Sequence, residues 1–203
     1  MSRTASARSA TRRTFRSTAV GLVVLTAAIV GTLVYQSASA SAPSFREVLG
    51  GASSGDDGAL PDGVTVADDE HAGVANLDPS LLQALRDAAA AAADDGIELS
   101  ITSGWRSPER QDQLLREAIA EYSSEEEAAR WVATADTSAH VSGDAVDIGP
   151  SEATPWMAEH GAAYGLCQIY GNEPWHLELR PEAIAGGCPA TYADPTQNPR
   201  MQQ

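Results

Sequence analysis

Two short clusters of metal-ligand side chains constrain how this chain can fold, because their residues have to meet in space. The first cluster supplies His140 and Asp147, and the second, further along the chain, supplies Glu173 and His176. Two imidazoles and one carboxylate suit zinc, and three protein ligands leave the fourth position of a catalytic zinc for water. Glu173 precedes a ligand by three residues and stays free to transfer a proton. The sequence therefore predicts a catalytic zinc site formed by His140, Asp147 and His176.

The segment that joins His140 to Asp147 has to turn. With this spacing, an ordinary strand would point the two side chains to opposite faces. Residues 142–144 (Ser-Gly-Asp) are a turn signal whose glycine can adopt a positive φ. We therefore expect a bend that aims both side chains at one point, with Asp144 as a turn residue rather than a ligand.

Hydrophobic periodicity and capping signals predict an α+β domain. Helices are expected from Asp78-Pro79 to residue 94, from Ser107-Pro108 onward, from Ser123 or Ser124 through Val132, and over residues 151–164 with an interruption near Pro155. Strands are expected at residues 97–103, 166–170 and 175–179, the last two as a hairpin in which His176 points away from an apolar face. The predicted fold is a small, largely antiparallel sheet with helices on one side and the metal at its mouth.

The N-terminus carries an export signal. Residues 1–40 contain five arginines and no acidic residue, and an apolar run over residues 19–34 follows the arginines. Residues 38–40 (Ala-Ser-Ala) fit a cleavage site, but the apolar run could also remain in the bilayer as an anchor, although it is shorter than the ~20 residues of a full span. Either way, the arginine asymmetry predicts that the bulk of the protein lies outside the membrane.

Composition excludes one class of partner. Beyond residue 40, eight arginines and no lysine stand against all 28 acidic residues, and the whole chain has a net charge of −15. A surface this acidic repels phosphate backbones, so we expect no nucleic-acid partner. The excess charge is typical of a soluble exported surface. The sequence carries no signal of an oligomeric state.

The chain has two cysteines, Cys167 and Cys188, both in the part expected to lie outside the membrane. Disulfides persist in that environment, so we expect a bond between them. Zinc ligation and a buried free thiol are the alternatives. A disulfide here would tie the C-terminal tail to the strand that leads into the second cluster.

Three regions follow from these observations. Residues 1–40 form the signal peptide or N-terminal membrane anchor. Residues 41–73 are rich in Gly, Ser, Asp and Ala and are predicted to be a flexible linker. Residues 74–203 are long enough for one compact domain, which ends in an irregular, disulfide-tied tail.

Three motifs in the domain resemble one enzyme family. Along the chain these are residues 103–107 (Ser-Gly-Trp-Arg-Ser), residues 138–147 (Ser-x-His, then Asp) and residues 173–176 (Glu-Pro-Trp-His). In this order they are similar to motifs of the zinc D-alanyl-D-alanine carboxypeptidases of the VanY kind within the M15 metallopeptidases. The resemblance covers roughly residues 77–179. Trp105 stands where the family has Tyr, a change that bears on substrate preference rather than on the chemistry.

The resemblance implies a fold shared with hedgehog-type domains and a set of roles. Glu173 is implied as the general base, and Arg106 as the group that binds either the terminal carboxylate of the peptide or the oxygen that develops charge. Ser138 and Gln111 match family positions near the substrate, and each could equally be a cap or a hydrogen-bond donor to other site residues.

The implied function is removal of the terminal D-alanine from peptidoglycan stem peptides by an exported enzyme. An endopeptidase that cuts L-alanyl-D-glutamate bonds in the same polymer would use an almost identical site. A non-catalytic zinc-containing wall-binding module is the third alternative. Glu173 counts against this module, because binding alone needs no group that transfers protons.

Overall fold

The computed structural model describes residues 55–202. The predicted export segment, residues 1–40, and the first part of the predicted linker, residues 41–54, lie outside the described residues. Within the described part, none of the helices has the length and apolar character that crossing a membrane would require.

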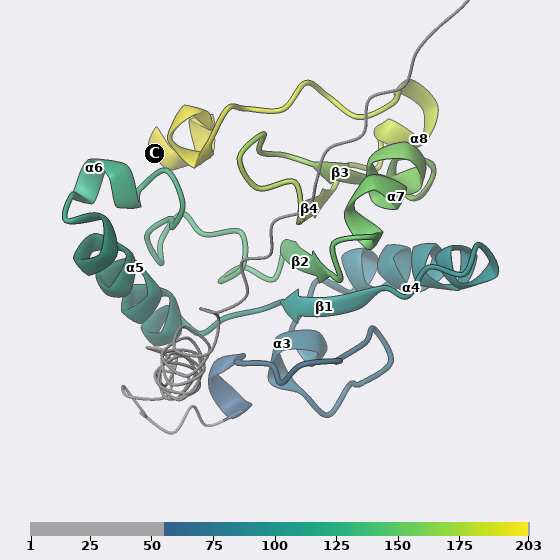
Figure 1. Ribbon diagram of the computed structural model, residues 1–203, viewed down its shortest axis with the longest axis horizontal. Helices are drawn as coiled ribbons and strands as arrows, with labels where there is room; N and C mark the ends of the chain where they lie inside the picture. Colours follow the sequence, from purple (N-terminus) through teal and green to yellow (C-terminus); the bar gives the residue numbers. More distant parts are fainter. Residues whose placement is uncertain (1–54, 203) are drawn as a thin grey trace, which may run out of the picture. The chain divides into compact units, whose positions relative to one another are not determined.

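The centre of the fold is a four-stranded antiparallel sheet with the strand order β1-β2-β4-β3. The strands are β1 (Ser100–Ser103), β2 (Ala145–Gly149), β3 (Leu166–Gln168) and β4 (His176–Leu179). The α-helices are α3 (Ala72–Ala75), α4 (Pro79–Asp94), α5 (Pro108–Tyr122), α6 (Glu125–Ala128), α7 (Ala153–His160) and α8 (Ala183–Gly186). Figure 1 shows the strands in the middle, with α5 and α6 to one side of them and α4, α7 and α8 to the other side. The predicted α+β class and the antiparallel sheet are confirmed.

Side-chain caps start the helices where the sequence predicts. The Asp78 carboxylate accepts hydrogen bonds from the backbone N–H groups of Ser80 and Leu81 at the start of α4. Ser107 caps α5 in the same way, and Ser124 caps α6. Each cap satisfies backbone donors that have no partner inside the helix, which is typically worth about 1 kcal/mol.

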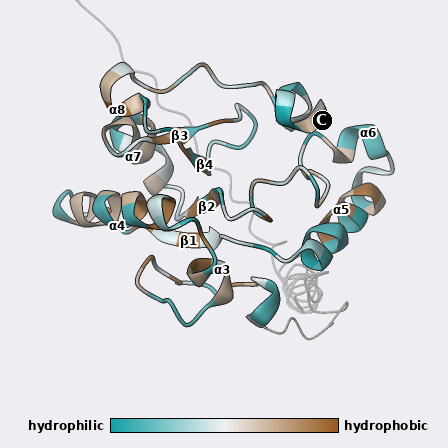
Figure 2. Ribbon diagram, turned by 180° about the vertical axis from the view of Figure 1, so that it is seen from behind, coloured by the Kyte–Doolittle hydropathy of each residue, from teal (hydrophilic) through white to brown (hydrophobic). Residues whose placement is uncertain are grey.

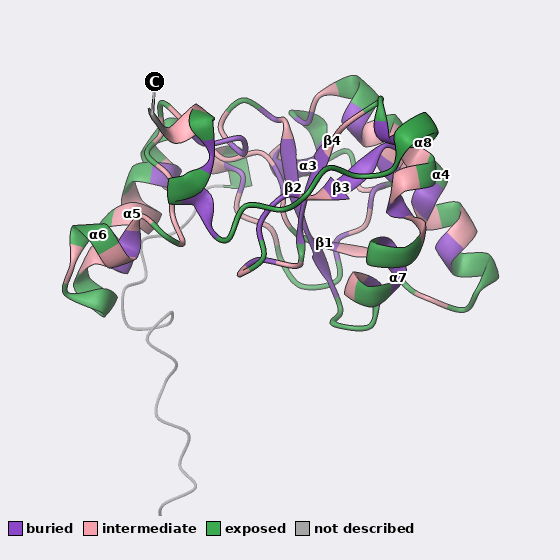
Figure 3. Cartoon of the chain, turned by 90° about the horizontal axis from the view of Figure 1, so that it is seen from above, coloured by how far each residue is buried: buried purple, intermediate pink, exposed green. Residues whose placement is uncertain are grey.

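The two faces of the sheet have different roles. Val146 on β2 and Leu177 on β4 are fully buried and belong to one hydrophobic core with residues of α4 and α7. On α4, Leu81 and Leu85 are completely buried, and complete burial of one such side chain stabilises the fold by about 1.5–3 kcal/mol. Figure 2 shows the alternation of apolar and polar residues along α4, and Figure 3 shows that the strands in the middle of the domain are largely buried. The opposite face of the sheet remains for polar side chains.

The predicted linker boundary at residue 73 is wrong for residues 55–73. Val64 and Val66 are buried in the main core, and the backbone N–H of Ile101 donates to the carbonyl of Val64 at 2.7 Å. Gly58, with φ +91°, lies so close to the chain at Trp105 that there is no room for a Cβ. This segment has few large apolar residues, but the two valines and its backbone contacts are enough to attach it.

Four predicted element boundaries also need correction. The strand predicted at residues 166–170 ends at Gln168. Helix α6 ends at Ala128, so Trp131 lies beyond it in a turn and Val132 lies in irregular structure. Helix α7 is not interrupted at Pro155, because first-turn residues donate no intrahelical hydrogen bond; it continues to His160 and passes into a 3-10 turn. The strand predicted at residues 97–103 is regular only from Ser100, although Leu99 and Ile101 are buried as expected.

The C-terminal tail is tied down along its length. Cys167 and Cys188 form the predicted disulfide. Further along, Arg130 pairs with Asp194 at 3.1 Å, and Asn198 donates to the Tyr170 hydroxyl at 2.8 Å. As predicted, the tail is mostly irregular, apart from α8 and two 3-10 turns, η3 (Pro195–Gln197) and η4 (Pro199–Gln202).

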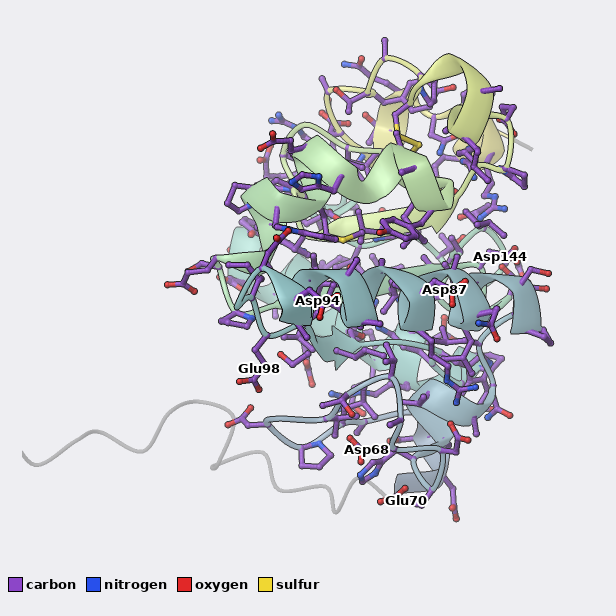
Figure 4. The ribbon with its side chains drawn as sticks, turned by 90° about the vertical axis from the view of Figure 1, so that its right-hand side faces the viewer. Asp68, Glu70, Asp87, Asp94, Glu98 and Asp144 are labelled. Carbon is purple, nitrogen blue, oxygen red and sulfur yellow. A yellow bond between two sulfur atoms is a disulfide. The ribbon has the colours of Figure 1, made fainter. Side chains whose placement is uncertain are left out.

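The acidic residues lie mainly on the outside. Figure 4 labels Asp87 and Asp94 on the side of α4 that is turned away from the core, and both are exposed. This placement agrees with the interpretation of the negative charge as a solvated surface.

Candidate metal centre and active site

The strand register brings the two predicted clusters together. Asp147 on β2 lies directly opposite His176 on β4 in the antiparallel pair. Their neighbours Val146 and Leu177 face the apolar core, so Asp147 and His176 share the opposite face. As predicted, His176 points away from the apolar face. However, β4 is buried on both faces, and Trp175 lies outside the strand with 40% of its surface exposed.

A turn brings His140 to the same place. Gly143 adopts φ +79°, and its N–H donates to the carbonyl of His140 at 3.2 Å, so the chain reverses as the Ser-Gly-Asp signal predicts. The Nδ1 atom of His140 lies 2.8 Å from the carbonyl oxygen of Gly104. That contact leaves Nε2 of His140 facing the other two side chains.

The three predicted ligand atoms form a triangle suited to one metal ion. His140 Nε2 lies 3.2 Å from His176 Nδ1 and 3.4 Å from Asp147 Oδ1, and His176 Nδ1 lies 3.1 Å from the same oxygen. A tetrahedral zinc with bonds of about 2.0–2.1 Å separates its ligand atoms by about 3.3 Å. The described side chains therefore fit a metal without rearrangement, and His140, Asp147 and His176 form a group that could hold one.

The three ligand side chains shift one another's pKa values. Burial raises the pKa of Asp147, but His140 and His176 outweigh this effect and hold the pKa well below its usual range. Burial lowers the pKa of His140, and the nearby Arg106 adds to that shift. For His176, burial also acts to lower the pKa, but hydrogen bonds to Asp147 and Glu178 raise it to about 9. The pKa values of the two imidazoles therefore shift in opposite directions.

Glu173 stands beside the triangle as a separate carboxylate. Its Oε2 atom lies 4.0 Å from His176 Nδ1, and its Oε1 atom is buried without a hydrogen-bond partner among the described residues. Burial raises the pKa of Glu173 to about 7 in the metal-free site. A pKa near the working pH suits a group that accepts and returns a proton.

Arg106 is held at the site by three hydrogen bonds. Its Nε donates to Ser103 Oγ at 2.8 Å, and one terminal nitrogen donates to Gln111 Oε1 at 3.2 Å. The other terminal nitrogen donates to Asp147 Oδ2 at 3.0 Å, so Arg106 holds the carboxylate oxygen that faces away from the triangle. A guanidinium carries five N–H donors, and two of them remain for an anion.

All the predicted site residues line one cavity of about 330 Å³. Gln111 is 1% exposed and donates to the carbonyl of Ala133, which fixes the amide that Arg106 contacts. Ser138 is buried at the cavity wall, 6% exposed. Gln111 therefore orients another site residue, and Ser138 lines the cavity.

Two residues that contact His176 were not predicted from the sequence. The Tyr170 ring lies 5.1 Å from the His176 ring and lines the same cavity. The Glu178 Oε1 atom lies 3.4 Å from His176 Nε2, and the carboxylate is 1% exposed. Glu178 could have been found from the sequence, because strand residues two apart share a face.

Comparison with known proteins agrees with this geometry. The profile of the VanY family, described as D-alanyl-D-alanine carboxypeptidase, matches residues 74–182, which is more than half of the chain. This chain belongs to the VanY family. The resemblance seen in its motifs is thereby confirmed, and the matched region contains every predicted metal ligand.

Individual relatives are similar to this chain over parts of their length. A D-alanyl-D-alanine carboxypeptidase from Enterococcus faecalis is 34% identical over 120 residues, which are 47% of this chain and 44% of that protein. The structure of LdcB, an LD-carboxypeptidase, is 25% identical with a TM-score of 0.51, covering 63% of this chain and 70% of LdcB. A vancomycin-resistance VanY mutant in complex with Zn(II) is 30% identical with a TM-score of 0.48, covering 51% of this chain and 72% of that protein.

Proposed function

We propose that this protein is a zinc-dependent D-alanyl-D-alanine carboxypeptidase that acts on peptidoglycan stem peptides. The observation that carries the proposal is the triangle of His140, Asp147 and His176 atoms, with edges of 3.1–3.4 Å and the free carboxylate of Glu173 beside it. Membership of the VanY family and the 34% identity to a D-alanyl-D-alanine carboxypeptidase support this choice of substrate.

The donor set favours zinc over other metals. Two imidazole nitrogens and one carboxylate oxygen, arranged for a tetrahedron with one position open, are the ligands of a catalytic zinc, whereas magnesium and calcium prefer oxygen ligands. When bound here, zinc would act as a Lewis acid and lower the pKa of water to ~7.

Glu173 is the proposed general base. Its carboxylate would accept a proton from the attacking water and pass it to the departing amine of the terminal residue. Burial keeps its pKa near neutrality, so both steps are accessible at neutral pH.

Arg106 has a double role in this proposal. Its hydrogen bond to Asp147 fixes the orientation of that ligand, and its two remaining N–H donors face an anionic group of the substrate. The anion is either the terminal carboxylate of the peptide or the oxygen that gains charge as the bond breaks. Ser138 would add a hydroxyl to the same wall of the cavity.

We further propose that the protein is exported and acts on the outer side of the membrane, either secreted or anchored by residues 1–40. The arginine-rich, acid-free start of the chain and the apolar run behind it support export. The disulfide between Cys167 and Cys188 agrees with an oxidising location.

Product analysis tests the proposal. The purified, zinc-loaded protein is incubated with a synthetic stem pentapeptide that ends in D-Ala-D-Ala, with and without a chelator. Release of free D-alanine that stops with the chelator is expected. Absence of cleavage by the folded, zinc-loaded protein would contradict the proposal for this peptide and favour a wall-binding module.

A second candidate activity comes from the similarity to LdcB, an LD-carboxypeptidase. Such an enzyme would remove the D-residue from a tetrapeptide rather than from a pentapeptide. The same assay with the tetrapeptide as substrate separates the two. Cleavage of the tetrapeptide alone would assign the LD activity, and cleavage within the stem would assign the L-alanyl-D-glutamate endopeptidase.

A further inference from the structure

The two ring nitrogens of His176 face different groups. Nδ1 faces the triangle, 3.1 Å from Asp147 and 3.2 Å from His140. Nε2 faces away from it, toward Glu178. A neutral imidazole carries one proton, so a ring that offers Nδ1 to a metal must carry its proton on Nε2. That proton needs an acceptor.

Glu178 is the acceptor that the fold provides. Its Oε1 atom lies 3.4 Å from His176 Nε2 and is the only hydrogen-bond partner of this nitrogen within residues 55–202. The two side chains share a face of β4 because they are two residues apart in a strand. The backbone thereby fixes their mutual orientation.

Glu178 occupies a costly position for a carboxylate. It is 1% exposed, and its cross-strand neighbours are Ala145 on β2 and Cys167 on β3, both completely buried. An apolar side chain at such a site is often as stable as a buried ion pair or more stable. Burial of a charge in the middle of the sheet therefore calls for a reason other than stability.

Arg180 holds the other end of the carboxylate. It donates to Glu178 Oε2 at 2.6 Å and, through its second terminal nitrogen, to the carbonyl of Leu179 at 2.9 Å. This arrangement leaves Oε1 free for the imidazole. The Arg180 side chain is 31% exposed, whereas the Glu178 side chain is 2% exposed, so the pair is directed inward rather than into water.

The two metal-facing histidines differ in this respect. The outer nitrogen of His140 meets a neutral carbonyl, that of Gly104, at 2.8 Å. The outer nitrogen of His176 meets a carboxylate. A carboxylate partner fixes the tautomer and ring orientation and also makes the imidazole a more basic ligand.

We propose that Glu178, anchored by Arg180, is a positioning residue that holds His176 with its proton on Nε2 and strengthens its bond to the metal. The inference rests on the proposed zinc function of this site, but it goes beyond the ligands and the general base. It predicts that the affinity for zinc depends on a side chain that does not touch the metal.

Two substitutions separate the parts of this role. Glu178→Gln keeps an oxygen that can accept from Nε2 and removes the charge, whereas Glu178→Leu removes the acceptor and leaves an apolar side chain of similar size. Glu182→Gln, at an exposed position four residues further on, is the matched control. Zinc affinity of the full chain is measured by competition with a chromophoric chelator. Thermal melts of the metal-free proteins report whether each variant folds.

Zinc affinity is expected to fall about 10- to 100-fold for Glu178→Leu, with a smaller loss for Glu178→Gln and none for Glu182→Gln. The ¹⁵N NMR signals of His176 in the zinc-loaded protein provide a second readout, which a merely structural role would not change. They should show the proton on Nε2 in the original chain and faster exchange of that proton in Glu178→Leu.

Folded Glu178 variants that bind zinc as tightly as the control, with unchanged His176 signals, would overturn the inference. If Glu178→Leu does not fold, the affinity of Glu178→Gln decides, because it preserves size and shape. Zinc affinity is measured without substrate. The inference can therefore fail in an enzyme that releases D-alanine, and it can hold in a protein that does not.

Discussion

Substitution of Gly58 tests whether residues 55–73 support the active site. Gly58 has φ +91°, and an added Cβ would lie 2.1 Å from the carbonyl oxygen of Trp105 and 3.0 Å from the Cα of Arg106. Gly63 has φ +80° with nothing within 4 Å of an added Cβ. Gly58→Ala and Gly63→Ala therefore introduce the same backbone strain, but only the first also collides with the loop that carries Arg106.

The two substitutions should therefore destabilise the domain by different amounts. The left-handed conformation costs an alanine about 1–2 kcal/mol at either position. At Gly58 the neighbouring chain must also move away from the new Cβ, and such overpacking destabilises the fold by a further ~1–3 kcal/mol. For a domain of this size, each kcal/mol lowers Tm by about 2–4 °C. A shift of about 1 Å at Arg106 should also lower kcat/KM about 100-fold, because catalysis depends on such positioning.

Thermal melts and D-alanine release are the two assays for this pair. We expect Gly63→Ala to lower Tm by a few degrees and to leave the activity unchanged. We expect Gly58→Ala to lower Tm further and also to reduce the rate of D-alanine release. Equal Tm values and equal activities of the two variants would refute the reasoning. They would mean that the packing of residues 55–73 does not affect the loop that carries Arg106.

Three further predictions concern the site and the tail. His176 has a pKa of about 9 and must lose a proton to bind zinc. The affinity for zinc, measured by chelator competition, should therefore rise about tenfold per pH unit from pH 7 to pH 8.5, and an affinity that does not change with pH would contradict this. Arg106→Lys keeps the charge but loses the planar guanidinium that contacts both Gln111 and Asp147, so kcat/KM should fall sharply in a protein that still folds. An unchanged kcat/KM would exclude the proposed role of Arg106. Removal of the bridge from Cys167 to Cys188, which spans 21 residues, should cost about 3 kcal/mol and about 10 °C in Tm, and an unchanged melt would show that the bridge does not stabilise the fold.

The sequence was sufficient to predict which residues meet in the site. Spacing and side-chain chemistry singled out His140, Asp147, Glu173 and His176, and the turn at Gly143 followed from the Ser-Gly-Asp signal of residues 142–144. The caps at the starts of the helices were equally visible, because a capping side chain acts on N–H groups of its own segment. Local signals of this kind are contained in the sequence.

Features that depend on packing between distant segments were not predictable. Residues 55–73 look like a linker because few of them are apolar, yet Val64 and Val66 are buried in the core. The Arg106 contact with Asp147 joins residues 41 positions apart and depends on the strand register. The alternation along β4 places Glu178 on the same face as His176, but it does not show that this face is buried.

The proton-transfer role of Glu173 is the central claim, and one substitution tests it most directly. Glu173→Gln removes the proton acceptor and leaves the three ligands in place, since the carboxylate lies 4.0 Å from His176 Nδ1 and outside the triangle. Zinc content and D-alanine release from a D-Ala-D-Ala pentapeptide are measured on the same preparation. We predict one zinc per chain and a loss of kcat of at least about 100-fold. A zinc-loaded variant that releases D-alanine at the original rate would contradict the account.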